Sequence, residues 1–478
     1  MRSSLLACIA SFGICGVVAA LQETVLFPQN ITQQSSYGFQ TLRHAAFPKY
    51  AVRVKKTDFC DSTVGAYTGY IDIEARHIFF YFFDSRRDPE NDDVILWTNG
   101  CSGASMGLFM EIGPCKVTGP EAELANNPWA WNEVANMIFI DQPIGTGFSY
   151  ADYGEYVSTT EEAAIDVAAF VAIFFEYFSH LKGNKLHLAG ESYAGRYIPV
   201  FASEIYDQNT KLSEAGMTPI NLASIIIANG CTDMLKMYPS YYEVQCQHKT
   251  FPPVTEISRC VEMKRALPRC EKWLKEGCFD NRDLINCNAA VTYCEALVMD
   301  PFRYNGRNPY DLSKPCEGKY VETLCYPVTK TIAKYLERED VRRQIGVDPV
   351  LPAKFSGCAW DVKARFRNSQ DHLNPTQHYI GALLDRGIRV LLYIGENDWM
   401  CNWVANERMS LDLEWHGQAD FTNSSLRPWT YEDHVAGLTR NASLLTYATI
   451  KGAGHMAPYD KPRETLDLIR KWLAEQPL

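Results

Sequence analysis

The sequence of 478 residues predicts an α/β fold with a mostly parallel central sheet that helices cover on both faces. Short apolar runs of strand length recur along the chain. Runs without a polar–apolar alternation are typical of strands buried on both faces of a sheet. Strands that alternate with helices indicate parallel order. The clearest runs cover 77–83, 94–97, 137–140, 186–190, 224–230, 389–395 and 444–450.

Residues 159–184 form a helical pattern between the third and fourth of these runs. Thr159 or Thr160 can cap the first turn, and the glutamates that follow suit the positive end of the helix dipole. Lys182 and Gly183 are typical of a helix end. The pattern therefore predicts a crossover helix between two parallel strands.

Residues 1–20 have the pattern of a secretory signal peptide. Arg2 supplies the positive charge, an apolar stretch follows, and small residues suit cleavage after Ala20. A membrane anchor is the alternative, although the run is short for a membrane span. We expect a secreted protein or one in the lumen of a vacuole or lysosome. Residues 21–48 are polar and irregular, and we expect a propeptide or an N-terminal extension there.

The net charge of −11 argues against a nucleic acid or an anionic membrane as partner. Asn30, Asn423 and Asn441 each begin an Asn-X-Ser/Thr sequon, which agrees with a secreted glycoprotein. Neither feature predicts an oligomeric state.

The cysteines separate a core from an insertion. Of the 16 cysteines, Cys8 and Cys15 would leave with the signal peptide, and the even number that remains suggests disulfides. Residues 233–375 are rich in cysteine, charge and proline, and we expect a stapled, loop-rich insertion there. The core would comprise 49–232 and 376–478. The wide cysteine spacing does not suit a zinc site, and we expect no metal and no organic cofactor.

A Gly-x-Ser-x-Gly-like sequence follows the run 186–190. It reads GESYAG over 190–195, so that Gly195 comes one position late. A strand, a sharp turn and a helix form the context of a nucleophile elbow, in which the hydroxyl of Ser192 would stand clear of the sheet. An ordinary turn serine is the alternative, and partner residues decide between the two.

A serine nucleophile needs a base, and the base needs a carboxylate that orients it. In α/β hydrolases the order along the chain is serine, acid, histidine, with the last two after late strands. Here the last two apolar runs lead into Glu396 and Asp398, and into a glycine-rich loop with His455. These side chains can meet Ser192 at one edge of the sheet. A turn histidine bonded to backbone is the alternative for His455.

These segments resemble the serine carboxypeptidase family. The matching sequences are GESYAGRYIP, GENDWMCNW and GAGHMAP, together with NPWAWNEVANMIFIDQPIGTGFSY and GRNPYDLSKPC…LCYP. The resemblance implies an α/β-hydrolase fold with a disulfide-rich cap. It implies a serine-type exopeptidase that releases C-terminal residues from peptides and proteins through an acyl-enzyme. It also implies a triad of Ser192, Asp398 and His455, with Asp398 rather than Glu396 as the acid.

The resemblance places Trp97, Asn99, Glu111 and Glu191 where the family binds the C-terminal carboxylate of its substrate. Ionised glutamates would repel this carboxylate. Burial and mutual repulsion would keep them protonated, so that they donate hydrogen bonds instead. We therefore expect peptidase activity to favour acidic pH. A solvated or salt-bridged side chain is the alternative for each glutamate.

The oxyanion loop departs from the family pattern. Tyr193 follows the nucleophile, and its N–H would be one donor. The second would come from Gly100 or Cys101, but the loop WTNGCSGASMGLF is shorter than in the family and lacks a clear match for its second glycine and its proline. Three explanations stay open: a reshaped loop, an error in the gene model, and a weakly active or non-catalytic homologue.

The resemblance also implies disulfides. It gives no partner to Cys60, Cys115 or Cys231, and it makes Cys401 an unpaired thiol near the site. The implied pairs are Cys101–Cys358, Cys246–Cys260, Cys270–Cys294, Cys278–Cys287 and Cys316–Cys325.

Tyr193, Met456 and Cys401 are expected to line the substrate pocket, where apolar side chains would favour hydrophobic residues; plain packing is the alternative. An acyltransferase on the same scaffold is a rival function, because an alcohol can replace water in resolving an acyl-enzyme.

Overall fold

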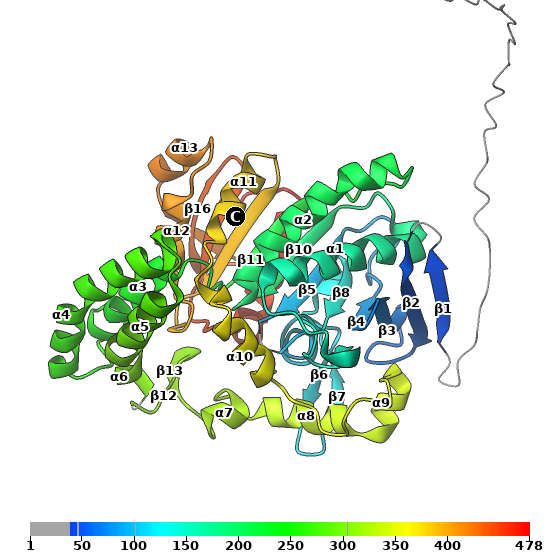
Figure 1. Cartoon of the computed structure of the whole chain (residues 1–478), viewed down its shortest axis with the longest axis horizontal. Coiled ribbons are helices and arrows are strands. Elements are labelled where there is room, and N and C mark those ends of the chain that lie inside the picture. Colours follow the sequence, from blue (N-terminus) through cyan, green and yellow to red (C-terminus); the bar gives the residue numbers. More distant parts are fainter. Residues whose placement is uncertain (1–38, 45–46, 101, 304) are drawn as a thin grey trace, which may run out of the picture. The chain divides into compact units, whose positions relative to one another are not determined.

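The structure is a computed structural model (Figure 1). The expected signal peptide, the sequon at Asn30 and the loop residue Cys101 lie outside the residues that it describes, and so does the predicted pair Cys101–Cys358. The described residues are 39–44, 47–100, 102–303 and 305–478.

A 13-stranded sheet forms the centre of the fold (Figure 1). Its strands are β1 (Gln40–His44), β2 (Phe47–Thr57), β3 (Ala66–Ile73), β4 (Arg76–Phe83), β5 (Val94–Asn99), β8 (Asn136–Ile140), β9 (Tyr150–Ala151), β10 (Leu186–Glu191), β11 (Leu222–Ala228), β14 (Arg389–Gly395), β15 (Arg427–Tyr431), β16 (His434–Ala442) and β17 (Leu445–Ile450). Their order is β1-β2-β3-β4-β8-β5-β10-β11-β14-β17-β16-β15, and β9 pairs with β4. The strands from β8 to β17 in this order run parallel.

The predicted apolar runs coincide with β4, β5, β8, β10, β11, β14 and β17. The antiparallel strands at both edges of the sheet were not predicted. Residues 40–44 and 47–48, which the sequence places in the N-terminal extension, form β1 and the start of β2. In β2, buried residues alternate with more exposed ones, including lysines and an arginine. A half-exposed strand of this kind carries no continuous apolar run, which is why the sequence pattern missed it.

Alternate residues of the central strands face two hydrophobic cores. In β11, Ile225 and Ile227 belong to one core and Ile226 belongs to the other. The first core includes residues of α1 (Thr160–Tyr177), α2 (Ala194–Glu214) and α11 (Gln377–Leu384), and the second includes residues of α8 (Val328–Glu337), α9 (Glu339–Ile345) and α15 (Pro462–Leu473). Both faces of the sheet are therefore covered, as the apolar runs predict.

The crossover helix α1 begins as predicted. Thr159 is its cap, in a capping box with Glu162. The helix ends at Tyr177, and the 3-10 turn Ser179–Leu181 follows it, so the end signal at Lys182 lies after this extra turn.

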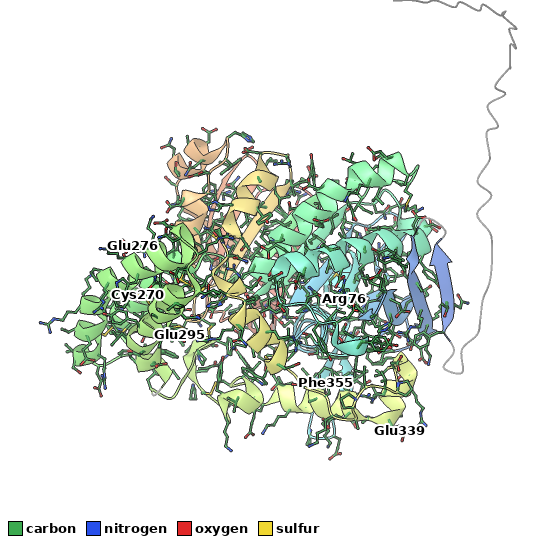
Figure 2. The ribbon with its side chains drawn as sticks, in the orientation of Figure 1. Arg76, Cys270, Glu276, Glu295, Glu339 and Phe355 are labelled. Carbon is green, nitrogen blue, oxygen red and sulfur yellow. A yellow bond between two sulfur atoms is a disulfide. The ribbon has the colours of Figure 1, made fainter. Side chains whose placement is uncertain are left out.

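Between β11 and β14 the chain forms a largely helical insertion, where Figure 2 marks Cys270 on α4 (Figures 1 and 2). The expectation of a loop-rich insertion was wrong, because helices carry many of its cysteines. Besides α8 and α9, its elements are α3 (Met234–Cys246), α4 (Ile257–Leu274), α5 (Leu284–Cys294), α6 (Asp300–Arg303), β12 (Arg307–Asn308), β13 (Asp311–Pro315), α7 (Tyr320–Thr323) and α10 (Trp360–Asn368). The predicted pairs present are Cys246–Cys260, Cys270–Cys294, Cys278–Cys287 and Cys316–Cys325.

The remaining elements lie outside the insertion and the large sheet. Cys60, which had no predicted partner, pairs with Cys115 at the start of β6. These elements are β6 (Cys115–Thr118), β7 (Glu123–Asn126), α12 (Trp403–Asp412), α13 (Gln418–Asn423) and α14 (Ala457–Asp460).

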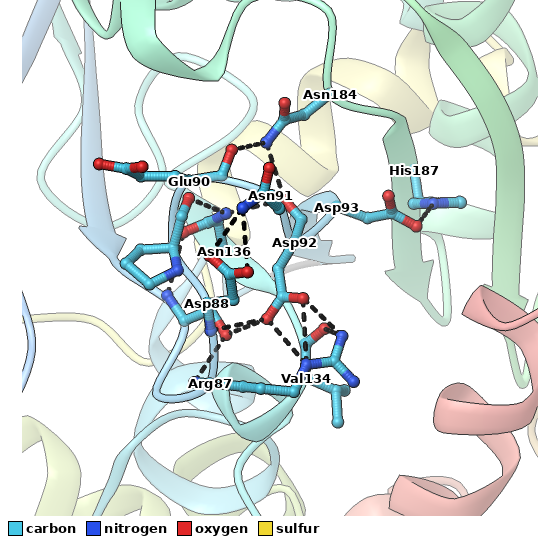
Figure 3. A network of polar contacts seen from close by, with 12 residues as sticks. Arg87, Asp88, Glu90, Asn91, Asp92, Asp93, Val134, Asn136, Asn184 and His187 are labelled. Carbon is cyan, nitrogen blue, oxygen red and sulfur yellow. Dashed lines mark hydrogen bonds and ion pairs between the residues drawn. The ribbon is translucent and has the colours of Figure 1, made fainter.

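A polar network fixes the amino-terminal ends of β5, β8 and β10 (Figure 3). The carbonyl oxygen of Asp92 accepts from the side-chain amides of Asn136 and Asn184, at 2.9 and 3.0 Å. The next residue, Asp93, is hydrogen-bonded to His187 Nε2 at 3.0 Å. These bonds hold three parallel strands at one end, so that their carboxyl ends keep a fixed order at the other.

Two features of the structure bear on the expected entry of the protein into the secretory pathway. Within the described ranges, no helix has the length and apolarity that a bilayer crossing requires. Asn423 and Asn441 are exposed, and their sequons are accessible on the surface.

Two buried aspartates bind protons more tightly in the folded than in the unfolded chain. Burial raises the pKa of Asp141 to about 7 and that of Asp166 to about 6, above the ordinary value of 3.8. Between about pH 4 and these values, the folded chain holds more protons than the unfolded chain. The free energy of unfolding must therefore fall as the pH rises through this window.

We predict that Asp166→Asn removes part of this pH dependence. Asp166 is 1% exposed and accepts from Arg76 at 2.8 Å, and an amide oxygen can still accept there. Denaturant unfolding measures the free energy of unfolding at each pH. Between about pH 4.5 and 7.5, this free energy should fall by roughly 2–3 kcal/mol more in the wild type than in the variant. Asp433→Asn, in an exposed turn, is the control. Equal slopes in wild type and Asp166→Asn would contradict the prediction.

Candidate active site

Ser192, the predicted nucleophile, lies in a sharp turn between β10 and α2. Its φ is 68°, in the left-handed region that serine rarely adopts. Its carbonyl oxygen accepts from the N–H groups of Gly195 and Cys231, at 3.0 Å each. A Cβ at Gly190 would lie only 2.6 Å from the Cβ of Ala194, so the close approach of strand and helix requires glycine. This strained turn has the geometry of a nucleophile elbow.

Asp398, the predicted acid, follows β14 and is 0% exposed. Its carboxylate accepts from His455 Nδ1 at 2.7 Å and from Asn229 Nδ2 at 2.9 Å. It also accepts from the N–H groups of Met400 and Cys401, at 2.8 and 3.2 Å. These donors satisfy both oxygens of a carboxylate that water does not reach.

The geometry favours Asp398 over Glu396 as the partner of His455. Glu396 accepts from Thr449 Oγ1 at 2.8 Å instead. An ionised carboxylate can only accept, so the bond to Asp398 assigns the proton to Nδ1 of His455. Nε2 is then the ring nitrogen that can take a proton.

His455, the predicted base, follows β17 and is 2% exposed. Its N–H donates to the carbonyl oxygen of Tyr310 at 2.6 Å, and the two rings lie 5.0 Å apart. Tyr310 belongs to the insertion, between β12 and β13. Nearby, Leu312 donates to the carbonyl oxygen of Asn397 at 2.9 Å. The insertion therefore contacts the loops of both the base and the acid.

Strand order brings the candidates to one edge of the sheet. The strands β10, β11, β14 and β17 are adjacent and parallel, and Ser192, Asn229, Asp398 and His455 follow them in that order. Among the described residues, neither Ser192 Oγ nor His455 Nε2 has a hydrogen-bond partner. Tyr310 packs against His455 and lines the same cavity as Ser192, which links the two sides of the site.

Asn99, at the end of β5, organises two buried glutamates. Its Oδ1 accepts from Trp97 Nε1 at 2.8 Å and from the N–H of Gly107 at 2.9 Å. Its Nδ2 is thereby directed to Oε1 of Glu111 and of Glu191, at 3.2 Å each. The single N–H of the Trp97 ring is used on Asn99, so Trp97 orients this amide.

Burial raises the pKa of both Glu111 and Glu191, and the charge of Glu111 raises the pKa of Glu191 further. Each glutamate is 1% exposed, and within the described part of the chain neither Oε2 atom has a hydrogen-bond partner. A carboxyl that keeps its proton can donate through this oxygen. Glu191 directly precedes Ser192, so the glutamate pair lies beside the nucleophile turn.

Gly100 lies against the backbone of Tyr193, since a Cβ at Gly100 would be 2.8 Å from Tyr193 N. The N–H of Tyr193 has no hydrogen-bond partner among the residues described. Asp141 anchors the loop that follows Gly100, by accepting from the N–H of Ala104 at 2.8 Å. The shortened loop therefore still brings Gly100 to Tyr193. Cys101, the other candidate donor, lies outside the described residues.

A cavity of about 210 Å³ opens beside Ser192. Tyr193 lines it, and its hydroxyl donates to Asp371 at 2.6 Å. Met456 and Cys401 were also expected there, but they are 2% and 0% exposed, and the cavity wall described here does not include them. Large side chains in the wall include Tyr238, Tyr241, Met299, Val362 and Phe366.

The prediction of an unpaired thiol at Cys401 was wrong. Cys401 forms a disulfide with Cys231, and the two Cα atoms lie 5.0 Å apart. The resemblance carried the free thiol over by position alone. It could not account for a cysteine in the loop after β11, which supplies the partner.

A family model described as serine carboxypeptidase matches residues 57–475. The chain belongs to the serine carboxypeptidase family. It is therefore a serine-type carboxypeptidase, a hydrolase that acts on peptide substrates.

Known relatives of this serine carboxypeptidase agree with that result. It is 38% identical to carboxypeptidase Y homolog A of Fusarium vanettenii over 433 residues, which are 89% of this chain and 77% of that protein. It is 36% identical to carboxypeptidase Y of Saccharomyces cerevisiae over 460 residues, 94% of this chain and 83% of that one. The crystal structure of Kex1, a prohormone-processing carboxypeptidase of S. cerevisiae, matches its fold with a TM-score of 0.72 at 22% identity, over 86% of this chain and 92% of that one.

Three contacts of the carboxypeptidase site were not predicted. Asn229 could have been predicted from the sequence, because a polar residue at the carboxyl end of a central parallel strand lies at the edge of the sheet where ligands bind. No sequence pattern predicts the contacts of Tyr310 and Cys231, because each reaches the site through a long-range contact with another loop.

We predict that Asn229→Ala lowers kcat about tenfold or more and changes KM less than twofold. The variant removes one donor from Asp398, and a hydrogen bond to a charged group contributes roughly 1.5–3 kcal/mol. Hydrolysis of a blocked dipeptide measures both constants. Asn221→Ala, at the other end of β11, is the control. An unchanged kcat in Asn229→Ala would show that this contact does not matter for catalysis.

Proposed function

We propose that this carboxypeptidase works through a triad of Ser192, His455 and Asp398. His455 Nε2 takes the proton of Ser192 Oγ as this oxygen attacks the scissile carbonyl carbon, and Asp398 stabilises the imidazolium. The imidazolium then protonates the leaving amine, and the C-terminal residue departs. Water attacks the acyl-enzyme with the same imidazole as base, and Ser192 regains its proton. The 2.7 Å bond between His455 and Asp398 supports these roles.

The N–H groups of Tyr193 and Gly100 are the proposed oxyanion hole. An oxyanion needs donors that are already in place, and each contributes about 3 kcal/mol to lowering the barrier. The free N–H of Tyr193 and the close packing of Gly100 against it support this assignment. On this proposal the short loop forms a working site, which argues against a non-catalytic homologue.

Asn99, Glu111 and Glu191 are the proposed site for the C-terminal carboxylate of the substrate, with Trp97 orienting Asn99. The observation that carries this proposal is the buried glutamate pair next to Ser192, with one unpartnered oxygen on each carboxyl. Protonated carboxyls can donate to a carboxylate, whereas ionised ones would repel it. Activity on peptides would then favour acidic pH.

We place the protein in the secretory pathway, with a vacuole or the cell exterior as its destination. A relative that is 35% identical over 95% of this chain is a vacuolar serine-type carboxypeptidase of S. cerevisiae. The disulfides and the exposed sequons at Asn423 and Asn441 suit an oxidising lumen. The raised pKa values of Asp141 and Asp166 suit an acidic one.

A comparison of two blocked dipeptides, one a free acid and one its C-terminal amide, tests this function. At about pH 5 we expect kcat/KM for the free acid to exceed that for the amide about a hundredfold, because the amide carries no charge for the glutamate pair to recognise. From pH 5 to 8, kcat/KM for the free acid should fall tenfold or more as the pair loses its shared proton. Ser192→Ala should hydrolyse neither substrate.

The Glu191→Gln variant distinguishes ionisation of the glutamate pair from ionisation of other groups as the cause of the pH dependence. Glutamine cannot ionise, so the fall in kcat/KM between pH 5 and 8 should become less than threefold. Glu396→Gln is the matched control, because Glu396 bonds Thr449 and not the site. A pH profile that is flat in the wild type, or equally steep in Glu191→Gln, would contradict the proposed carboxylate site.

The cavity beside Ser192 is the proposed subsite for the acyl-side residue. Tyr193 lines this cavity, whereas Asn99 and the two glutamates are not among its lining residues. The cavity would therefore lie on the acyl side of the scissile bond, opposite the proposed site for the C-terminal carboxylate. Burial of one large apolar side chain contributes about 1.5–3 kcal/mol. The aromatic wall therefore favours a large apolar residue.

Dipeptides that differ only in the penultimate residue test this preference. We expect kcat/KM for phenylalanine to exceed that for glycine at least tenfold. Met299→Ala should lower the phenylalanine value severalfold and leave the glycine value unchanged, because Met299 lines the cavity. Met217→Ala, on another cavity, is the control. Equal kcat/KM for phenylalanine and glycine would rule out this subsite.

A further inference from the structure

One disulfide joins the loop after β11, which is hydrogen-bonded to the nucleophile turn, to the loop of the acid. Cys231 follows β11, and its N–H donates to the carbonyl oxygen of Ser192 at 3.0 Å. Cys401 follows Asp398 in the same loop, and its N–H donates to Asp398 Oδ2 at 3.2 Å. The Cys231–Cys401 disulfide therefore links the segment bonded to Ser192 covalently to the segment bonded to Asp398, and the two cysteines are 170 residues apart in the sequence.

The two sulfur atoms face different surroundings. Cys231 lines the cavity beside Ser192, whereas Cys401 is 0% exposed. The Cys401 sulfur lies within 4.8 Å of a ring nitrogen of His455 and of a carboxylate oxygen of Asp398. A small thiol in the cavity can therefore reach one end of a bond whose other end contacts the acid and the base.

The other disulfides that the structure describes lack these contacts. None of their cysteines donates a backbone hydrogen bond to Ser192 or Asp398. They join segments within the insertion, or join β6 to the loop before β3. Loss of one of them would change stability without acting directly on the triad.

We propose that the Cys231–Cys401 disulfide positions the catalytic triad and makes the rate of hydrolysis sensitive to thiols. The inference rests on the proposed roles of Ser192, Asp398 and His455. With the bond intact, the loop of Asp398 is tied to the backbone behind Ser192. When it is broken, hydrogen bonds and side-chain packing hold the two loops without a covalent link, and the base loses its fixed distance from the nucleophile.

A dithiol supplies the reducing equivalents for this change. One thiolate of the dithiol attacks the sulfur of Cys231, the S–S bond breaks, and Cys401 leaves as a thiolate. The second thiol of the dithiol then displaces Cys231 from the mixed disulfide and forms a disulfide within the reagent. Two cysteines are reduced, one dithiol is oxidised, and an added oxidant reverses the sequence.

Reduction of the intact enzyme with dithiothreitol is the test, with two substrates. One is a blocked dipeptide, and the other is a blocked amino-acid ester, whose hydrolysis does not depend on recognition of a C-terminal carboxylate. We expect kcat for both to fall fivefold or more, KM to change less than twofold, and re-oxidation to restore kcat. Alkylation and mass mapping should show that the loss follows labelling of Cys231 and Cys401.

Two double variants complete the experiment. The Cys231→Ala, Cys401→Ala variant should begin at the reduced rate and not respond to dithiothreitol. The Cys278→Ala, Cys287→Ala variant, which removes a disulfide of the insertion, should respond like the wild type. Unchanged kcat while Cys231 and Cys401 are labelled, or a loss that follows another pair, overturns the inference.

Three further outcomes are distinguishable. If the Cys231→Ala, Cys401→Ala variant does not fold, as judged by circular dichroism, the labelling experiment on the wild type decides alone. If Ser192→Ala retains ester hydrolysis, the proposed triad fails and the inference fails with it. If Ser192→Ala is inactive and reduction has no effect, only the inference fails.

Discussion

The site depends on one buried carboxylate, that of Asp398. A charge without exposure to water is unfavourable unless hydrogen bonds compensate for lost hydration. Donors from three segments meet this need: the imidazole of His455 after β17, the amide of Asn229 after β11, and two N–H groups in its own loop. The adjacent parallel strands of the sheet place these donors together. The orientation of the base therefore follows from the strand order.

The glutamate pair presents the opposite case. Glu111 and Glu191 are about as buried as Asp398, yet apart from each other their only side-chain partner in the described chain is the amide of Asn99. Too few donors and a neighbouring carboxyl raise the pKa of both. One edge of the sheet thus holds a carboxylate suited to stabilise an imidazolium and two carboxyls suited to donate to an anion. The proposed function, peptide cleavage with recognition of a free C-terminus, would use both.

Sequence patterns predicted the parts of this arrangement that depend on local residues. Continuous apolar runs gave the parallel strands, and the polar residues directly after them gave Ser192, Asp398 and His455. The patterns did not give the antiparallel strands at the two edges, which carry no long continuous apolar run. They also missed the bond of Cys401 to Cys231 and the contact of Tyr310 with His455, because these join segments far apart in the chain. Only the folded arrangement shows which loops meet.

Covalent labelling by a fluorophosphonate tests the central claim, that Ser192, His455 and Asp398 act as one unit. The account predicts a single labelled residue, Ser192, and no labelling of Ser192→Ala. It also predicts that His455→Ala and Asp398→Asn reduce the second-order labelling rate by about a thousandfold or more while the fold is retained. Labelling at another residue, or a rate in His455→Ala close to that of the wild type, would contradict it.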